Sequence, residues 1–380
     1  MNKKIYICIG SKKRFEDFLN KKIPEGEEIF YFLDLIKDYN ANLRQQYAYL
    51  HGEIDVKNLI VHADDYASVY EHVIQNFVAI VTTNHNVETT FLHNPPQRVI
   101  DSLKVKYSDV MEYHLPEYKN LNKSVLKEIW DTVDVDIVGQ KKAKKAVISN
   151  LYRHCDQSYK KPIVLLFLGD SGIGKTEMAK TISKVLGGNL LRVQFSMMQT
   201  TEGYNYVFGA EHSKSSLAKD LMARESNIVL IDEFDKVNPI FYNAFYQMFD
   251  EGIFVDTNYR VDLERCIFIC TSNFMSEADA IKSMGMPIFS RFNEAIIFED
   301  LSVSDKEELL KRIYEAYLMN LSKEEKNVIE GTDIYKWHKD RLKDYKNVRI
   351  IRSRVEKAIN DKLVEPIIAG DVNKGNTYES

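Results

Sequence analysis

The segment Gly169-Asp-Ser-Gly-Ile-Gly-Lys-Thr176 limits the fold of this chain more narrowly than any other feature of its sequence. The continuous apolar run Ile163 to Leu168 comes directly before it, and a helical pattern follows. Such a run is typical of a strand that is buried on both faces of a parallel sheet. The glycines let the backbone curl so that successive N–H groups point inward, and the helix N-terminus adds its positive end. We therefore expect a strand, a phosphate-binding loop and a helix within an α/β domain.

This loop predicts how the phosphates of a nucleotide are held. The Lys175 ammonium would neutralise the β- and γ-phosphates of ATP, and the Thr176 hydroxyl would bind Mg²⁺. The residues expected to contact the nucleotide along the loop are Gly169, Asp170, Ser171, Gly172, Ile173, Gly174, Lys175 and Thr176.

A second apolar run, Ile228 to Ile231, ends in two carboxylates, Asp232 and Glu233. Ligands of open α/β sheets bind at the carboxyl ends of the strands, so both carboxylates would face the phosphate-binding loop. Asp232 would bind the Mg²⁺, directly or through water. Glu233 would orient and polarise the attacking water, which makes it the expected catalytic base of an ATPase. The alternative, two acidic residues that close a strand at a solvent edge, loses weight beside a complete phosphate-binding loop.

Other apolar runs and helix signals complete this part of the chain. Asn238-Pro239 is typical of a helix N-cap followed by proline at the first helical position, and Gly252 would end that helix. Ser304 and Glu307 are expected to form a capping box, after which helical patterning dominates to about Ile368. The five runs that we interpret as sheet strands are Ile163 to Leu168, Leu190 to Phe195, Ile228 to Ile231, Cys266 to Cys270 and Ala295 to Phe298.

From about Ser124 to the C-terminus, the order of these motifs resembles the AAA+ family of ATPases, and within it the Clp-type protein unfoldases. The sequence Asp-Glu-Phe-Asp-Lys, which begins at Asp232, is similar to the motif at the acidic strand end in that group. Ile137 and Val138, which open the segment Ile-Val-Gly-Gln, look like its adenine contacts. With a linker near Leu115 to Asn122, the expected fold is α/β. It comprises an N-terminal α/β-type domain (1–120), a P-loop AAA+ core with a parallel sheet (121–300) and a helical lid (301–380).

The same resemblance implies three polar residues that complete the reaction site. Asn273, in Thr-Ser-Asn after the fourth strand, looks like sensor 1, which helps to position water and the γ-phosphate. Arg291 resembles the arginine finger that acts on the ATP of a neighbouring subunit, and Arg349 resembles sensor 2, although Asn347-Val348 replaces the usual Gly-Ala before it. Fixed cations of this kind stabilise the charge that builds up on the phosphate oxygens. A homo-oligomeric ring, a hexamer in this family, follows from the resemblance; read singly, each arginine is a solvated surface charge.

The resemblance departs from the unfoldase pattern in two places. Unfoldases grip polypeptide with an aromatic-aliphatic-glycine pore loop, and here Phe208 intervenes between Val207 and Gly209. The candidates for client contact are Tyr204, Tyr206 and Phe208, and the alternative is that the tyrosines pack at the base of a loop. The path from Asn273 to Arg291 is too short for the peptidase-docking loop of protease-linked relatives, so we expect no Clp-type peptidase as a partner.

Charge and cysteine content favour a cytoplasmic protein that acts on protein. A net charge of −5 gives no global cationic field for nucleic acid, which remains an alternative partner through a local basic patch. The start of the chain lacks the apolar core of a signal peptide, and no stretch is long enough for a membrane-spanning helix. Cys266 and Cys270 lie four apart in one strand-like run, so we expect both to be buried, reduced thiols on one face of the sheet.

Residues 1–120 carry a strand-like start at Lys4 to Gly10 and two short polar motifs, Asp55-Val-Lys57 and His62-Ala-Asp-Asp65. Nuclease or metal chemistry at these motifs competes with the interpretation that they are solvated surface, which we favour. Three functions remain open. The first is an ATP-driven ring that remodels or unfolds protein clients, the second a nucleic-acid-associated AAA+ switch or loader, and the third the ATPase of a stress or phage-defence effector system.

Overall fold

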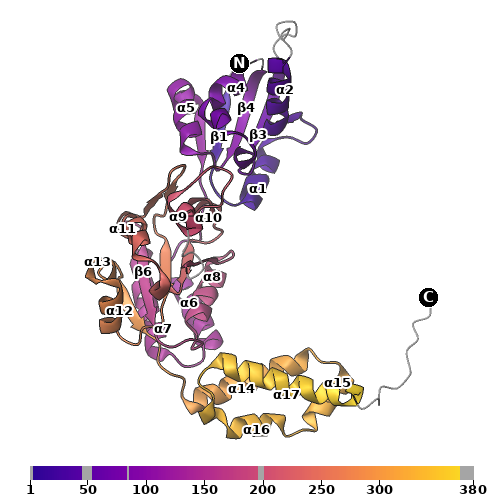
Figure 1. The fold of residues 1–380 in the computed structure, drawn as a ribbon, viewed down its shortest axis with the longest axis vertical. Helices are drawn as coiled ribbons and strands as arrows, with labels where there is room; N and C mark the ends of the chain where they lie inside the picture. The colour runs from indigo at the N-terminus through magenta and orange to yellow at the C-terminus, as the bar shows by residue number, and fades with distance from the viewer. Residues whose placement is uncertain (1–2, 45–53, 84, 196–200, 369–380) are drawn as a thin grey trace, which may run out of the picture.

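The structure, a computed structural model, describes residues 3–44, 54–83, 85–195 and 201–368. Three parts follow one another along an elongated molecule (Figure 1). An α/β part in indigo and purple lies at one end, a second α/β part lies in the middle, and a group of helices in yellow lies at the other end. The α/β fold with a helical C-terminal part agrees with the fold class expected from the sequence.

The N-terminal part contains a five-stranded sheet in the order β2-β3-β4-β1-β5, and all of its strand pairs are parallel. Its strands are β1 (Lys4–Cys8), β2 (Ile29–Tyr31), β3 (Ile54–Val61), β4 (His85–His93) and β5 (Met111–His114). Its helices are α1 (Lys12–Lys22), α2 (Phe32–Arg44), α3 (Glu71–Gln75), α4 (Phe77–Thr82) and α5 (Gln97–Tyr107). The side chains of α1 share one apolar cluster with one face of the sheet, and those of α2 to α5 cover the other face.

The central part is built on the predicted five-stranded parallel sheet, in the order β12-β6-β11-β8-β7. Its strands are β6 (Ile163–Leu168), β7 (Leu191–Gln194), β8 (Ile228–Asp232), β11 (Ile267–Thr271) and β12 (Glu294–Ile297). Alternate residues of β6 point to opposite faces, and every residue of this strand is buried because helices cover both sides. Cys266 and Cys270 are buried free thiols in the same apolar cluster, as expected.

Different helices cover the two faces of the central sheet. On one face lie α6 (Lys123–Asp136), α7 (Lys141–Leu151) and α8 (Lys175–Leu186). The other face packs against α10 (Leu217–Ala223), α11 (Tyr242–Glu251), α12 (Glu277–Met284) and α13 (Met286–Phe289). Asn238 caps the turn before α11, and Gly252 ends that helix at a φ of 69°, as the sequence predicts. The antiparallel hairpin of β9 (Ile253–Val255) and β10 (Arg260–Asp262) was not expected.

The C-terminal part consists of α14 (Val303–Met319), α15 (Lys323–Glu330), α16 (Ile334–Asp340) and α17 (Val348–Ile368), which share their own apolar cluster. The predicted capping box at Ser304 and Glu307 is wrong. Ser302 is the N-cap of α14, and it exchanges hydrogen bonds with the backbone and side chain of Asp305. An aspartate three residues after the cap reaches back as well as a glutamate does, so the helix begins two residues earlier.

The N-terminal and central parts meet through a few polar contacts. The Arg14 guanidinium donates to the carbonyl oxygen of Glu225 at 3.0 Å and lies over the Tyr118 ring, 4.9 Å from its centroid. The Gln97 N–H at the start of α5 donates to the carbonyl oxygen of Asn258 at the tip of the β9–β10 hairpin, at 2.8 Å. Among the described residues, no helix combines the length and apolar character that are needed to cross a membrane.

Candidate active site

The phosphate-binding loop joins β6 to α8, and its conformation depends on glycine at two positions. Gly169 has a φ of 124°, and a Cβ atom there would lie 2.5 Å from the carbonyl oxygen of Phe298. Gly174 has a φ of 107° and forms the N-cap of α8. Both φ values lie in the region that disfavours side chains. The loop therefore keeps its open curl only with glycine at these positions.

Lys175 is buried at the start of α8, with 7% of its surface exposed. Its ammonium donates to the carbonyl oxygens of Gly169 at 2.5 Å and Asp170 at 2.7 Å. Burial lowers the pKa of Lys175 to about 8, although the carboxylates of Asp170, Asp235 and Asp232 act in the opposite direction. Because only neutral carbonyl oxygens accept hydrogen bonds from this buried ammonium, an anionic phosphate bound beside it would stabilise its charge. Thr176 follows it, half-buried, in the first turn of α8.

The two carboxylates at the end of β8 are connected through one hydroxyl. Thr271, the last residue of β11, donates its hydroxyl hydrogen to Asp232 Oδ1 and accepts the backbone N–H of Glu233 at 3.1 Å. Glu233 has a φ of 57°, which turns the chain sharply after the strand, and Gln194 donates to its Oε2 at 3.3 Å. Thr271 was not singled out from the sequence, although it opens the segment that contains Asn273.

Arg192 on β7 is a second residue that the sequence did not reveal. Its guanidinium donates through both Nε and Nη2 to the same oxygen, Asp232 Oδ2, with Nε at 2.9 Å. Asp232 is 6% exposed, so this pair compensates a buried carboxylate. A metal ion at Asp232 would compete with Arg192 for the same oxygen. The only sequence signal was a charged residue inside a run that we interpreted as a strand.

Asp235 and Asn273 lie beside these carboxylates. Asn273 Nδ2 is 3.5 Å from Asp235 Oδ2, and Lys236 pairs with the same oxygen at 3.2 Å. The other oxygen of Asp235, Oδ1, is buried and has no hydrogen-bond partner among the described residues. A buried, unpaired carboxylate oxygen beside Lys175 fits a site that takes up a cation or water along with phosphate.

The C-terminal helices reach the phosphate-binding loop through the start of α17. Arg349 Nη1 donates to Ser171 Oγ at 3.1 Å, and the Val348 N–H donates to the carbonyl oxygen of Gly172 at 3.3 Å. Asn347 packs on Gly172, where a Cβ atom would lie 3.2 Å from the asparagine side chain. The structure thus brings Arg349 to the loop despite the missing Gly-Ala.

The segment after α6 lies under the other side of the loop. Ile137 is buried, and its Cγ2 lies 3.6 Å from a Cβ atom built on Gly174, while Val138 is half-buried next to it. Gln140, in a left-handed conformation at a φ of 56°, exchanges two hydrogen bonds with the backbone of Glu299, at 2.7 Å and 3.0 Å. Gln140 therefore ties this segment to the chain that follows β12.

Arg291 does not reach the phosphate-binding loop of its own chain. It follows α13, donates through Nε to Asp250 at 2.9 Å and lies over the Tyr246 ring, 4.1 Å from the centroid. A further bond to the carbonyl oxygen of Pro287 completes its contacts. These contacts hold the guanidinium against α11.

The three aromatic candidates for client contact lie on α9 (Thr201–Phe208), a helix rather than an open loop. Tyr206 is mostly buried, and its hydroxyl donates to Asp220 Oδ2 at 2.6 Å. Phe208 packs against the core and against Tyr204, with ring centroids 4.6 Å apart. Tyr204 is 47% exposed and is thus the candidate that solvent reaches most easily.

The polar motifs of the N-terminal part show the contacts of a solvated surface. Lys57 pairs with Glu27 at 2.7 Å, and Asp55 accepts from Asn86 at 2.8 Å. Asp65 accepts the backbone N–H of His62 at 2.8 Å, which closes a turn. Within the described ranges, no group of three or more His, Cys, Asp or Glu side chains is arranged to hold a metal ion.

This combination of features defines a class: a P-loop ATPase core with two carboxylates at the end of a neighbouring strand and a helical part whose arginine reaches the loop. Comparison with known proteins agrees. Residues 160–320 match the profile of the AAA domain (Cdc48 subfamily). The central part of the chain is therefore similar to an AAA domain over these residues.

Chaperone protein ClpB from three organisms is similar to this chain. The Tropheryma whipplei (strain TW08/27) protein is 28% identical over 242 residues, which cover 56% of this chain and 34% of ClpB. The Mycobacterium tuberculosis (strain H37Rv) protein is 29% identical and covers 65% of this chain and 32% of ClpB. The Aquifex aeolicus (strain VF5) protein is 26% identical, and the match covers 72% of this chain and 32% of ClpB. The chain thus spans about a third of the length of these relatives.

A solved structure shares the fold. Hsp104 in a closed state, reconstructed by cryo-electron microscopy with ATPγS and FITC casein, superposes with a TM-score of 0.56. The alignment covers 97% of this chain and 89% of that chain at 14% identity, so the likeness concerns the fold alone.

Replacing Thr271 by valine should lower ATP turnover by about 10- to 100-fold while ATP affinity changes little, because the hydroxyl orients Asp232 and Glu233 rather than the phosphates. Steady-state turnover and equilibrium ATP binding measure the two effects. Thr271→Ser keeps the hydroxyl and should restore most of the turnover. Equal turnover in the valine variant would exclude this positioning role.

ATP affinity should depend on pH through Lys175. Because the pKa of this ammonium is about 8 in the free protein, it is charged below that pH and loses its charge above it. Affinity should therefore be level from pH 6.5 to 7.5 and fall by up to about tenfold per pH unit above 8. Fluorescence titrations with a labelled nucleotide would measure this. Lys180→Ala, on the exposed side of α8, should keep the same profile, and a level profile up to pH 10 would contradict the assignment.

Proposed function

We propose that this chain is the subunit of an ATP-hydrolysing AAA+ ring, a homo-hexamer, that remodels or unfolds protein clients in the cytoplasm. The observation that carries the proposal is the linked group of Asp232, Thr271 and Glu233, which lies at the same sheet edge as the phosphate-binding loop. Nucleotide binding alone does not require a second carboxylate; hydrolysis requires one that polarises water.

In this proposal, each residue of the site has a separate task. Residues Gly169 to Thr176 hold the phosphates of ATP, with Lys175 as their counter-ion, and Ile137 and Val138 contact the adenine. Thr176 and Asp232 would hold Mg²⁺, which would neutralise charge on the β- and γ-phosphates. Arg192 contacts Oδ2 of Asp232, so a metal ion held directly by that oxygen would have to displace the guanidinium.

Glu233 then takes up a proton from the attacking water, and Asn273 helps to hold that water near the γ-phosphate. Arg349 already contacts Ser171 of the loop, so it stabilises phosphate charge from the lid of the same chain. Arg291 is held away from its own loop by α11, which supports a role across a subunit interface. Such a finger contributes about 10³- to 10⁵-fold to the rate in related phosphoryl transfer.

The choice of protein as client rests on the similarity to ClpB chaperones and on the absence of a cationic excess. Tyr204 is the best-exposed aromatic side chain of α9 and would make the client contact, with Tyr206 and Phe208 as its support. Residues 1–120 would recognise the client, residues 121–300 hydrolyse ATP and residues 301–380 close over the nucleotide; of these ranges, residues 1–2, 45–53, 84, 196–200 and 369–380 lie outside the described residues. We propose no Clp-type peptidase as a partner.

Glu233→Gln should bind ATP normally, reduce turnover by at least about 100-fold and retain labelled casein in an ATP-dependent complex, because the amide cannot accept the proton. Turnover, and co-elution of casein with a ring-sized particle, measure this; Glu251→Gln on the exposed end of α11 is the matched control. Stimulation of the unmodified protein by single-stranded DNA but not by casein would favour the switch or loader. Retained turnover would remove Glu233 as the base.

Arg291→Ala should leave ATP binding by its own subunit unchanged, because the guanidinium acts on the ATP of the neighbouring subunit. It should reduce turnover by about 10³-fold or more, because the neighbouring site loses the cation that stabilises charge on the phosphate. Arg312→Ala, an exposed arginine that pairs with Glu308 on α14, serves as the control. In mixtures, subunits that carry Arg291→Ala and subunits that carry Glu233→Gln should regain part of the activity, since some interfaces then contain both intact groups. Full turnover in a strictly monomeric preparation would contradict a finger that acts between subunits.

A further inference from the structure

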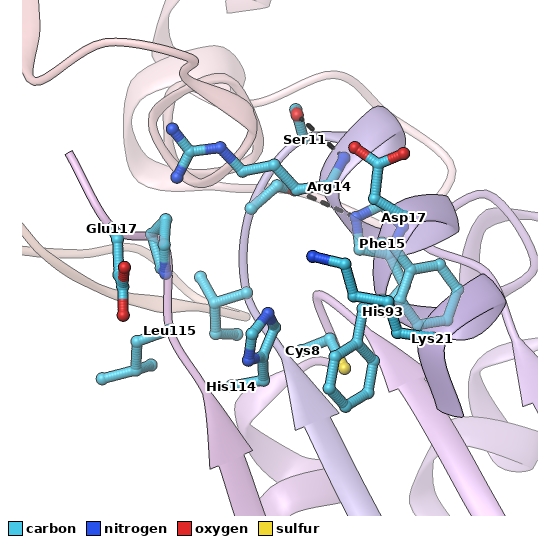
Figure 2. A pocket seen from close by; sticks show the side chains of 14 residues that line it. Cys8, Ser11, Arg14, Phe15, Asp17, Lys21, His93, His114, Leu115 and Glu117 are labelled. Carbon is cyan, nitrogen blue, oxygen red and sulfur yellow. Dashed lines mark hydrogen bonds between the residues drawn. The ribbon is translucent and has the colours of Figure 1, made fainter. Parts of the chain in front are cut away.

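A cavity of about 380 Å³ lies in the N-terminal part, outside the ATPase site. It opens at the carboxyl ends of β1, β4 and β5, where Cys8, His93 and His114 end their strands (Figure 2). A volume above about 300 Å³ is in the range of small-molecule sites.

The sheet topology places this cavity where such folds bind ligands. Strands β1 and β4 are neighbours, but their connections leave in opposite directions. After β1 the chain passes through α1 to β2 at one edge, and after β4 it passes through α5 to β5 at the other edge. The helices α1 and α5 consequently cover opposite faces, and the cavity lies on the side of α1, between that helix, the end of β4 and residues 114–117.

The backbone at the bottom of the cavity is held rigidly. Asn94 accepts the N–H of Gly10 at 2.9 Å and donates to its carbonyl oxygen at 2.8 Å, and it adopts a φ of 44° to do so. Gly10 has a φ of 143°, in the region that side chains disfavour. Two unusual backbone conformations that support each other indicate a shaped site rather than an incidental gap.

His93 offers an unused acceptor to this cavity. The side chain is 4% exposed, stacks on Phe15 with ring centroids 4.6 Å apart and lines the cavity. Its Nε2 lies 2.9 Å from the carbonyl oxygen of Gly10 and 3.2 Å from the amide nitrogen of Asn94, and we place the proton on Nε2 because the contact with the carbonyl oxygen is the shorter of the two. Burial lowers the pKa of His93, which keeps the ring neutral and leaves Nδ1 as an acceptor. No donor within the described residues reaches Nδ1, so a ligand hydroxyl or amine fits there.

The mouth of the cavity favours an anion. The first turn of α1 starts at the cavity and contains no acidic residue, so the positive end of the helix lies there. Arg14 borders the cavity only with the aliphatic part of its side chain, because its guanidinium contacts the carbonyl oxygen of Glu225. The Lys21 ammonium and the His114 ring point into the same space from α1 and β5 (Figure 2). Two carboxylates, Asp17 and Glu117, also line the cavity and limit the net charge.

We propose that this cavity binds a small phosphomonoester that also carries hydroxyl groups, such as a phosphorylated sugar. The phosphate lies between Lys21, His114 and the first turn of α1, and a hydroxyl of the ligand donates to Nδ1 of His93. The site binds without covalent chemistry, because burial raises the pKa of the Cys8 thiol to about 12 and leaves no thiolate.

The test uses the full chain with Lys175→Ala, which removes the main phosphate counter-ion of the ATPase site. Isothermal titration calorimetry with ribose 5-phosphate should reveal one saturable site, inorganic phosphate should bind there more weakly, and ribose should not bind measurably. Adding Lys21→Gln should weaken ribose 5-phosphate binding by about tenfold, because it removes one charged contact without disturbing the core. Lys37→Gln, an exposed lysine that pairs with Asp34 on α2, should have no effect.

Several results would overturn the proposal. Lack of saturable ribose 5-phosphate binding up to about 10 mM would exclude a phosphomonoester site. Equal affinity in the Lys21→Gln variant would place any binding elsewhere. Equal affinity for inorganic phosphate and ribose 5-phosphate would exclude the hydroxyl contact at His93. Circular dichroism of each variant verifies that the fold is intact.

Discussion

Burial of the central parallel sheet on both faces is the constraint on which the rest of the structure depends. Because every strand is parallel, the carboxyl ends of β6, β8 and β11 lie along one edge. That edge carries the phosphate-binding loop, Asp232 and Thr271. Two-sided burial leaves solvent only at the strand ends, so polar groups gather there and must satisfy one another. The Asp232–Arg192 pair and the Thr271 hydroxyl are the result.

The same principle operates a second time in the N-terminal sheet. Its strands are also all parallel, and its polar residues gather at the carboxyl ends of β1, β4 and β5. Arg14 belongs to α1, which borders that cavity, and its guanidinium contacts the backbone of Glu225 in the ATPase core. Figure 2 shows it directed away from the cavity, which it borders with the aliphatic part of its side chain. Arg14 thus joins the two α/β parts at the amino-terminal edge of the central sheet, since Glu225 lies just before the start of β8.

Much of the ATPase core could be predicted because its signals are local. The five sheet strands appear within one or two residues of the predicted runs, and the helix between Asn238 and Gly252 has the expected cap and end. The capping box of α14 was misplaced because Ser302 and Ser304 both precede an acidic residue by three positions, and only the backbone geometry selects between them. The β9–β10 hairpin was missed because its strands have three residues each, too few for a period to be visible.

The sequence by itself determined the phosphate-binding loop, the carboxylates Asp232 and Glu233 and the positions of the core strands along the chain, since each depends on neighbouring residues in the chain. Only the tertiary structure decided which distant side chains join them. Thr271 and Arg192 reach the carboxylates from other strands, and Gln140, at the start of α7, donates to the carbonyl oxygen of Ile173 in the loop. Arg349 reaches the loop from the far end of the chain. It also decided that Tyr206 packs inward and that a cavity forms beside His93. Contacts between residues that are far apart in the sequence depend on how the helices and strands pack, and no local sequence pattern predicts that packing.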